Sequence, residues 1–206
     1  MGILAKVSLA FWRFHFYPAV CTAFFLTLLF PTFFGVENAT FMQSAEIYER
    51  FFPLIGLIVF LPLYLPDSSE ETTLLIKTKR FSYVGILLLR FLQILITLTL
   101  LTCGCLLLFE LSNATIEFDR FFFSGIANAL FMGGLYAIGF AFANQPVTGL
   151  ILPLGYYVAS LFVGEKYLKI FYLFTLVEKD THSKLVLLFS GLLFILLSFV
   201  IRKRRK

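Results

Sequence analysis

The side chains best suited to catalysis or metal binding are few in this sequence, and they lie far apart. The chain has two histidines, His15 and His182, and its three cysteines lie inside apolar runs without CxxC spacing. A zinc site or a histidine acid–base pair needs several such groups close together. The sequence also contains neither a G-x-S-x-G nucleophile motif nor a P-loop. We therefore expect no catalytic residue, no metal site and no cofactor in this chain.

The strongest polar pattern is the segment 66–82, which reads P-D-S-S-E-E-T-T-L-L-I-K-T-K-R-F-S between two apolar runs. Ser68 followed by Glu71 forms a capping box, and acidic residues here suit the positive end of a helix dipole. The other end is basic, with Lys77, Lys79 and Arg80. An apolar stripe contains Leu74, Leu75 and Phe81. These features predict a short cytosolic helix that docks on another protein, and the alternative is a juxtamembrane loop whose basic residues only fix topology.

The composition is that of an all-α integral membrane protein. Of the 206 residues, 60% are hydrophobic and only 14% are charged, and the mean hydropathy is +0.92. A soluble domain carries about a quarter charged residues. One helical span takes about 20 residues, so the chain has room for about six spans and little else. The net charge of +5 does not indicate nucleic-acid binding, because the basic residues flank apolar runs.

The hydrophobic pattern divides the single membrane domain, 1–206, into spans and shorter segments. We expect six spans at 17–34, 51–65, 84–109, 121–143, 147–163 and 185–201. The second is short and follows a polar loop, 35–49. An interfacial helix is expected at 1–16 rather than a cleaved signal peptide, because no clean cleavage site follows. The segment 164–180 is too short and too charged to cross alone, so we expect an outer-leaflet or re-entrant amphipathic helix.

The basic residues predict the orientation of the chain. Most of the 17 Lys and Arg residues fall on one side if both termini and the loop 66–83 share that side. The positive-inside rule therefore places both termini in the cytosol. Arg90, near the start of the third span, is expected to extend toward the cytosolic headgroups.

The fourth span carries a face of small residues at every fourth position. These are Gly125, Ala129, Gly133, Ala137 and Ala141. Small side chains let two helices approach closely in lipid. We expect this face to pack within one subunit, with a seam between two subunits as the alternative, and Asn128 beside it to hydrogen-bond across it.

Ionisable residues in the middle of a span would indicate a proton or ion pathway. With the span limits given above, the spans contain essentially none away from their ends. This pattern argues against an ion-coupled carrier, although backbone carbonyls at broken helices could still bind ions.

The stretch 71–82, E-T-T-L-L-I-K-T-K-R-F-S, leads directly into a span with an early arginine, Arg90. This order of an acidic residue, a hydroxyl pair, Leu-Leu and a serine beside basic residues is similar to the corresponding loop of ABC-2 type permeases. The whole chain resembles these membrane subunits of ATP-binding-cassette exporters in its six spans, N-terminal interfacial helix and outer segment. It lacks the Gly or Pro common in their loop, and its basic residue and serine stand in reversed order.

The resemblance implies that the helix in 66–82 is a coupling helix, seated in a groove of a separate cytosolic ATPase subunit that binds ATP and Mg²⁺. The residues implied in this contact are Glu70, Glu71, Thr72, Leu74, Leu75, Lys77, Lys79 and Arg80. Two permeases, identical or related, would form a path through the plasma membrane for an amphipathic or lipophilic cargo. The alternatives are a non-transporting scaffold or regulatory subunit and a stand-alone carrier.

Overall fold

The computed structural model describes residues 9, 11–68, 83–178 and 180–205, and all its long elements are helices. In chain order they are η1 (Trp12–Phe16), α2 (Tyr17–Phe33), α3 (Phe41–Phe60), η2 (Leu61–Leu63), η3 (Leu65–Ser68), α5 (Tyr83–Leu111), α6 (Phe118–Ala143), α7 (Pro146–Val163), α8 (Glu165–Leu168), η4 (Lys169–Phe171) and α9 (Thr181–Arg205). Six helical stretches are long and apolar enough to cross a membrane. The chain is therefore a multi-pass helical membrane protein, as the composition predicts.

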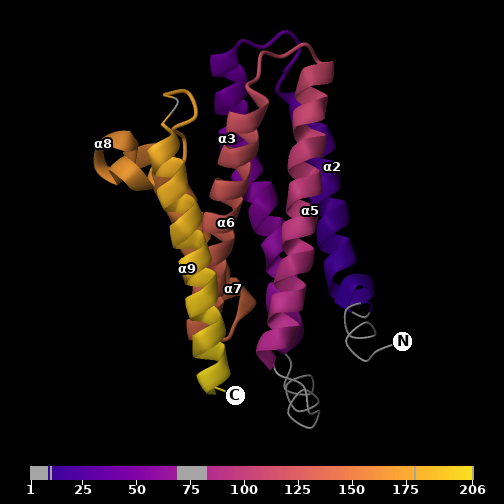
Figure 1. Cartoon of the computed structure of the whole chain (residues 1–206), viewed down its shortest axis with the longest axis vertical. Coiled ribbons are helices and arrows are strands. Elements are labelled where there is room, and N and C mark those ends of the chain that lie inside the picture. Colours follow the sequence, from indigo (N-terminus) through magenta and orange to yellow (C-terminus); the bar gives the residue numbers. More distant parts are fainter. Residues whose placement is uncertain (1–8, 10, 69–82, 179, 206) are drawn as a thin grey trace.

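The long helices run up and down as a bundle with two distinct ends (Figure 1). We call the end at which η1 begins and α9 finishes the terminal end. The turn between α6 and α7, where Asn144 adopts a left-handed conformation with φ 56°, is at this end as well. The connections between α2 and α3 and between α5 and α6 lie at the opposite end, which we call the distal end, as does α8 (Figure 1).

Helix α6 is the centre of the bundle, and small residues let its neighbours approach. A Cβ atom on Gly125 would lie 1.9 Å from the Tyr48 hydroxyl, and one on Gly133 would lie 2.3 Å from the Phe60 ring. Ala129 sits against Gly56 of α3 in the same way. The small-residue face of the fourth span therefore packs against α3 of the same chain, and its two remaining members, Ala137 and Ala141, are also fully buried.

A second close contact joins α6 to α9. A Cβ on Gly134 would lie 2.6 Å from the backbone oxygen of Gly191, and a Cβ on Gly191 would lie 2.6 Å from the backbone oxygen of Leu130. The neighbour in both cases is backbone, which cannot rotate away as a side chain can. The pattern of small residues at every fourth position does not include Gly134 or Gly191. Each helix contributes only one glycine to this contact, so no period reveals it.

The structure corrects the expected start of the second span. The predicted polar loop 35–49 is wrong, because α3 already begins at Phe41 and the spanning stretch Phe41–Asp67 is 27 residues long. Thr40 is the N-cap of α3 and forms a capping box with Gln43. That box was readable in the sequence, but the polar residues after it concealed the apolar stripe that runs through Tyr48 and Phe52.

The shorter segments differ from their expected forms in detail. The described part of the expected interfacial helix, Trp12–Phe16, continues into α2 without a break and belongs to a potential span, Trp12–Phe33. The segment 164–180 contains two short helices, α8 and η4, rather than one amphipathic helix. Most of the segment 66–82 lies outside the described residues, and its described start, Leu65–Ser68, is a 3-10 turn.

The contact between α6 and α9 predicts a strong position dependence for Gly-to-Ala changes. We expect Gly134→Ala and Gly191→Ala each to lower the free energy of unfolding by at least about 2 kcal/mol, because the added methyl overlaps backbone. SDS titration in mixed micelles, followed by circular dichroism, measures this change. The matched control is Gly104→Ala in α5, where a Cβ meets nothing within 4 Å. It should be neutral or stabilising by up to about 1 kcal/mol, and equal losses at all three positions would contradict the packing argument.

Candidate functional site

A buried ion pair closes the terminal end of the bundle between η3 and α5. Arg90 Nη1 lies 3.2 Å from Asp67 Oδ1 and donates to the backbone oxygen of Leu63, also at 3.2 Å. The Tyr83 hydroxyl donates to Asp67 Oδ2 at 2.6 Å. The side chains of Arg90 and Asp67 are 5% and 0% exposed. We call Asp67, Tyr83 and Arg90 the terminal clasp.

The clasp also reaches the N-terminal helix, because the Arg90 guanidinium lies 5.2 Å from the ring centre of Phe11. The sequence predicted that Arg90 would extend to the headgroups, and the structure shows that this is wrong. The side chain turns inward because a carboxylate and a backbone carbonyl accept its protons there. A buried guanidinium without such partners would carry a penalty of several kcal/mol.

A second cation, Arg202, is buried beside the clasp. It donates to Asn144 Oδ1 in the turn between α6 and α7, and its guanidinium lies 5.1 Å from the ring centre of Phe140 and 5.8 Å from that of Tyr64. Tyr64 in turn exchanges a hydrogen bond of 2.5 Å with Ser198 of α9. The expected sixth span ended at residue 201, but α9 continues through Arg202, whose side chain is buried.

Asp67 lies near the start of the segment 66–82 in which the docking helix is expected, and Tyr83 directly follows that segment. Only Ser68 stands between Asp67 and residues 69–82. The predicted contact residues, from Glu70 to Arg80, all lie in this stretch outside the described residues. The structure thus fixes both flanks of the segment to one buried ion pair at the terminal end.

A second buried ion pair lies at the distal end, between α3 and α9. Lys184 Nζ is 2.5 Å from Glu49 Oε1, with side-chain exposures of 4% and 1%. Ser124 of α6 donates to the same carboxylate oxygen at 2.9 Å, and Lys184 also donates to Asn128 Oδ1 at 3.2 Å. Three helices therefore meet at one pair of charges.

The same pair holds the segment 172–177, which we call the distal loop. Lys184 Nζ donates to the backbone oxygen of Leu173 at 2.5 Å, and the backbone N–H of Leu176 donates to Glu49 Oε2 at 2.9 Å. Asn128 Nδ2 also donates to the Leu173 oxygen, at 3.1 Å. The loop is thus tied to the bundle by backbone groups that end on the two buried charges. Asn128 was expected to hydrogen-bond across the small-residue face, but its partners are the distal loop and Lys184 of α9.

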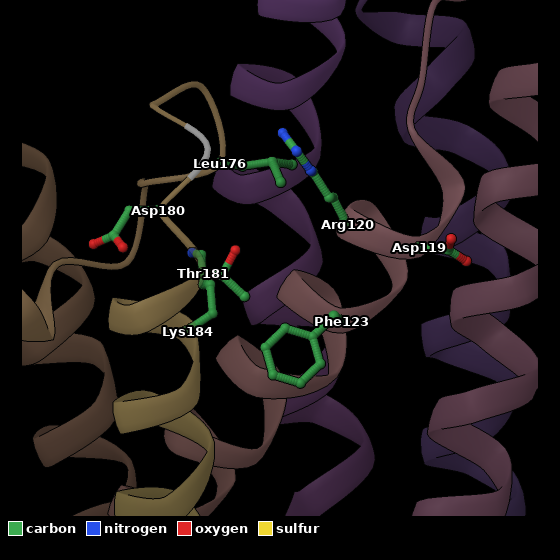
Figure 2. A pocket seen from close by; sticks show the side chains of 7 residues that line it. All are labelled: Asp119, Arg120, Phe123, Leu176, Asp180, Thr181 and Lys184. Carbon is green, nitrogen blue, oxygen red and sulfur yellow. The ribbon is translucent and has the colours of Figure 1, made fainter.

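Two hollows flank this pair. One, of about 210 Å³, lies between the starts of α6 and α9 and is lined by Lys184 (Figure 2). The other, of about 250 Å³, lies between α3, the end of α7 and the distal loop and is lined by Glu49. Each partner of the ion pair therefore borders a different cavity.

Two carboxylates beside these hollows have shifted pKa values. The Ser183 hydroxyl and the His182 N–H hydrogen-bond to Asp180, which lowers the pKa of its carboxyl. Glu178 shares a hydrogen bond with Glu165, which raises the pKa of the Glu178 carboxyl. Asp180 is therefore a stable negative charge at the start of α9.

Glu49 contradicts the expectation that the spans hold essentially no ionisable residues away from their ends, because it is buried in the third turn of α3. Arg90, Lys184 and Arg202 lie near the ends of their helices, but they too are buried, each 3–4% exposed. Glu49 was missed because it was placed in a loop. Its i−1 and i+3 neighbours, Tyr48 and Phe52, continue the apolar face of α3 and could have revealed a helix that already turns inward there.

Among the described residues, no group of three His, Cys, Asp or Glu side chains could hold a metal ion. Comparisons with models of known families, with curated proteins and with solved structures find no match to this chain. The resemblance to ABC-2 permeases therefore remains a prediction from the sequence.

The terminal clasp predicts strong energetic coupling between its charges. We expect Arg90→Met and Asp67→Asn each to lower the free energy of unfolding by about 3–5 kcal/mol, because each leaves a buried polar partner unpaired. The double variant should lose much less than the sum of the two. SDS titration of the four chains gives the coupling energy.

The exposed pair Glu46 and Arg50, 3.6 Å apart on α3, is the matched control for the clasp cycle. Its coupling should be under about 0.5 kcal/mol because both side chains reach solvent. A clasp coupling as small as that of this exposed pair would show that the buried charges do not depend on each other.

Proposed function

We propose that this chain is the membrane-spanning permease subunit of an ABC-2 type exporter. In this proposal both termini and the terminal end face the cytosol, in the plasma membrane, and a separate ATPase subunit binds ATP and Mg²⁺. A second permease copy, identical or related, completes the path. The cargo is amphipathic or lipophilic, in keeping with the apolar, Phe-rich spans, and includes peptides, lipids or drugs as classes.

The terminal clasp is the observation that best supports the proposal. A coupling segment has to pass a displacement from the ATPase to the spans, so its flanks must be fixed firmly to the helices they join. Here Asp67 and Tyr83 are joined by a 2.6 Å hydrogen bond, and Arg90 is paired with the same carboxylate. Displacing one flank without the other would expose unpaired charge in a low-dielectric interior. The two spans α3 and α5 are therefore expected to move together with the segment between them.

The clasp also touches Phe11, so the N-terminal helix shares the same anchor. In the proposed mechanism, closure of the ATPase dimer pushes on the coupling segment and the N-terminal helix together. The coupling segment and the N-terminal helix would both act on the bundle through the clasp. The path then switches between inner and outer access as a shift between two packings.

A stand-alone carrier is the second candidate, and the distal ion pair is the observation that favours it. Buried ionisable residues inside spans commonly line proton or ion pathways. Glu49 and Lys184 are such residues, and hollows border both of them. A carrier would work without an ATPase and would respond to a pH or ion gradient.

Purification of the tagged chain from its host in nanodiscs distinguishes the two candidates. We expect a soluble ATPase to copurify in a fixed ratio, and its rate of ATP hydrolysis to change when the permease is present. Mass spectrometry identifies the partner, and a phosphate-release assay measures the rate. Isolation of the chain alone, together with transport driven by an imposed pH gradient in liposomes, would contradict the exporter and support the carrier.

The coupling contact predicts a specific charge effect. Glu71→Lys should abolish most of the permease-dependent ATPase response, at least about tenfold, because it puts a like charge among the basic residues of the docking helix. The matched control is Glu110→Lys, an exposed acidic residue at the distal end of α5. Both variants should keep the circular dichroism of the parent chain. A normal ATPase response in Glu71→Lys would refute the assignment of the coupling helix.

A further inference from the structure

Each charge of the distal ion pair borders a hollow of its own, so the two charges can separate without entering a dry interior. We propose that Glu49 and Lys184 form a latch on the distal loop, and that the latch opens when Lys184 turns to Asp180 and Glu49 turns into the hollow that it shares with Arg50. This inference concerns the distal end alone and holds whether or not the chain is an exporter.

The closed latch is the arrangement in the structure. The two charges lie 2.5 Å apart, and the distal loop is held because Leu173 accepts from Lys184 and Leu176 donates to Glu49. Both backbone contacts depend on the charged side chains being in place. If the ions part, the loop loses both contacts in the same step.

Separating a buried ion pair is ordinarily very unfavourable, because each ion loses its partner inside a medium of low dielectric. The two hollows remove this barrier. Lys184 borders the hollow of about 210 Å³ and Glu49 borders the hollow of about 250 Å³. Each is large enough for several water molecules, so each ion can rotate toward solvent on its own side.

Lys184 also has an alternative partner in the hollow that it borders. Asp180 lies four residues before Lys184 at the start of α9, and both line this hollow. Asp180 precedes the first residue of α9, and its carboxylate accepts from the His182 N–H at 2.9 Å and from the Ser183 hydroxyl. Asp180 stays ionised because the Ser183 hydroxyl and the His182 N–H stabilise its carboxylate. A rotation of the Lys184 side chain is therefore enough to exchange partners.

Glu49 borders space for water on the other side of the pair. Its hollow is lined by Arg50, which is about half exposed and paired with Glu46, and also by the carboxylates of Glu165 and Glu178. Glu49 therefore gains hydration there, and Lys184 alone gains a new counter-charge. The exchange needs no separation of helices, because α6 stays locked to α3 and α9 through the glycine contacts at Gly133 and Gly134. The latch thus frees its two contacts with the distal loop, which keeps the bond from Asn128 Nδ2 to the Leu173 oxygen, while the bundle keeps its packing.

Cysteine accessibility of the distal loop measures the open fraction. Thr175, which is 2% exposed in the middle of the loop, is replaced by cysteine, a residue of similar size. The full chain in nanodiscs is then treated with a membrane-impermeant maleimide, and labelling at position 175 is followed over time by mass spectrometry. The parent chain without this change gives the background from its three native cysteines.

Two variants in the Thr175→Cys chain should change the labelling rate in opposite directions. Lys184→Met removes the latch cation, and we expect labelling to accelerate at least about tenfold. Asp180→Asn removes the alternative partner while its amide still caps α9, and we expect labelling to slow at least about threefold. The control is Asp119→Asn, whose carboxylate lies in the same region but turns away from Lys184 (Figure 2). It should leave the rate unchanged.

The outcomes that overturn the latch are distinct from those that overturn the proposed function, because no ATPase or cargo is present. An unchanged or faster rate in Asp180→Asn refutes the exchange, and so does an equal slowing in Asp119→Asn. An unchanged rate in Lys184→Met refutes the role of the ion pair. If Lys184→Met does not fold, the surface variant Asp180→Asn decides alone.

Discussion

The structure depends on neutralising the charges that its spans bury. Charged side chains inside a lipid-embedded bundle need partners, and here each pair joins two different spanning stretches. Glu49 meets Lys184 at the distal end, and Asp67 meets Arg90 at the terminal end. Each pair also takes up backbone groups that regular helix would leave unpaired, such as the Leu63 oxygen and the Leu176 N–H. The charges therefore define which loops and helix ends stay attached to the bundle.

Helix α6 supplies the second constraint, since it determines how closely its neighbours approach. Its glycines face three directions, with Gly133 against α3, Gly134 against α9 and Gly139 against α7. Packing in a membrane gains little from the hydrophobic effect, so close contact and interhelical hydrogen bonds are what hold such a centre together. Ser124 and Asn128 add interhelical hydrogen bonds to the close packing of α6. They bond to Glu49 and Lys184, the two charges that join α3 and α9.

Hydrophobicity made the number of spans predictable, and the period of small residues predicted a close helix contact on one face of the fourth span, because both are local patterns. Neither pattern identified α3 as the partner of that face. The ion pair of Glu49 and Lys184 was not predictable, because the spanning helices α5, α6 and α7 lie between these residues and no local pattern links them. The same limit applies to Arg90 and Arg202, which look like ordinary flanking charges until a carboxylate or an amide from another helix is placed beside them. Gly191 was missed for a similar reason, since a single glycine shows no period.

The two ion pairs share one helical stretch, which carries a member of each. Phe41–Asp67 begins at the distal end, contains Glu49 in its third turn and ends at the clasp residue Asp67. Under the proposed function, a displacement at the clasp acts on the same stretch that carries Glu49, while its partner Lys184 lies on α9. The contact between Glu49 and Lys184 is therefore where such a displacement is expected to act at the distal end, and energetic coupling between the two ion pairs is the property that would demonstrate this route.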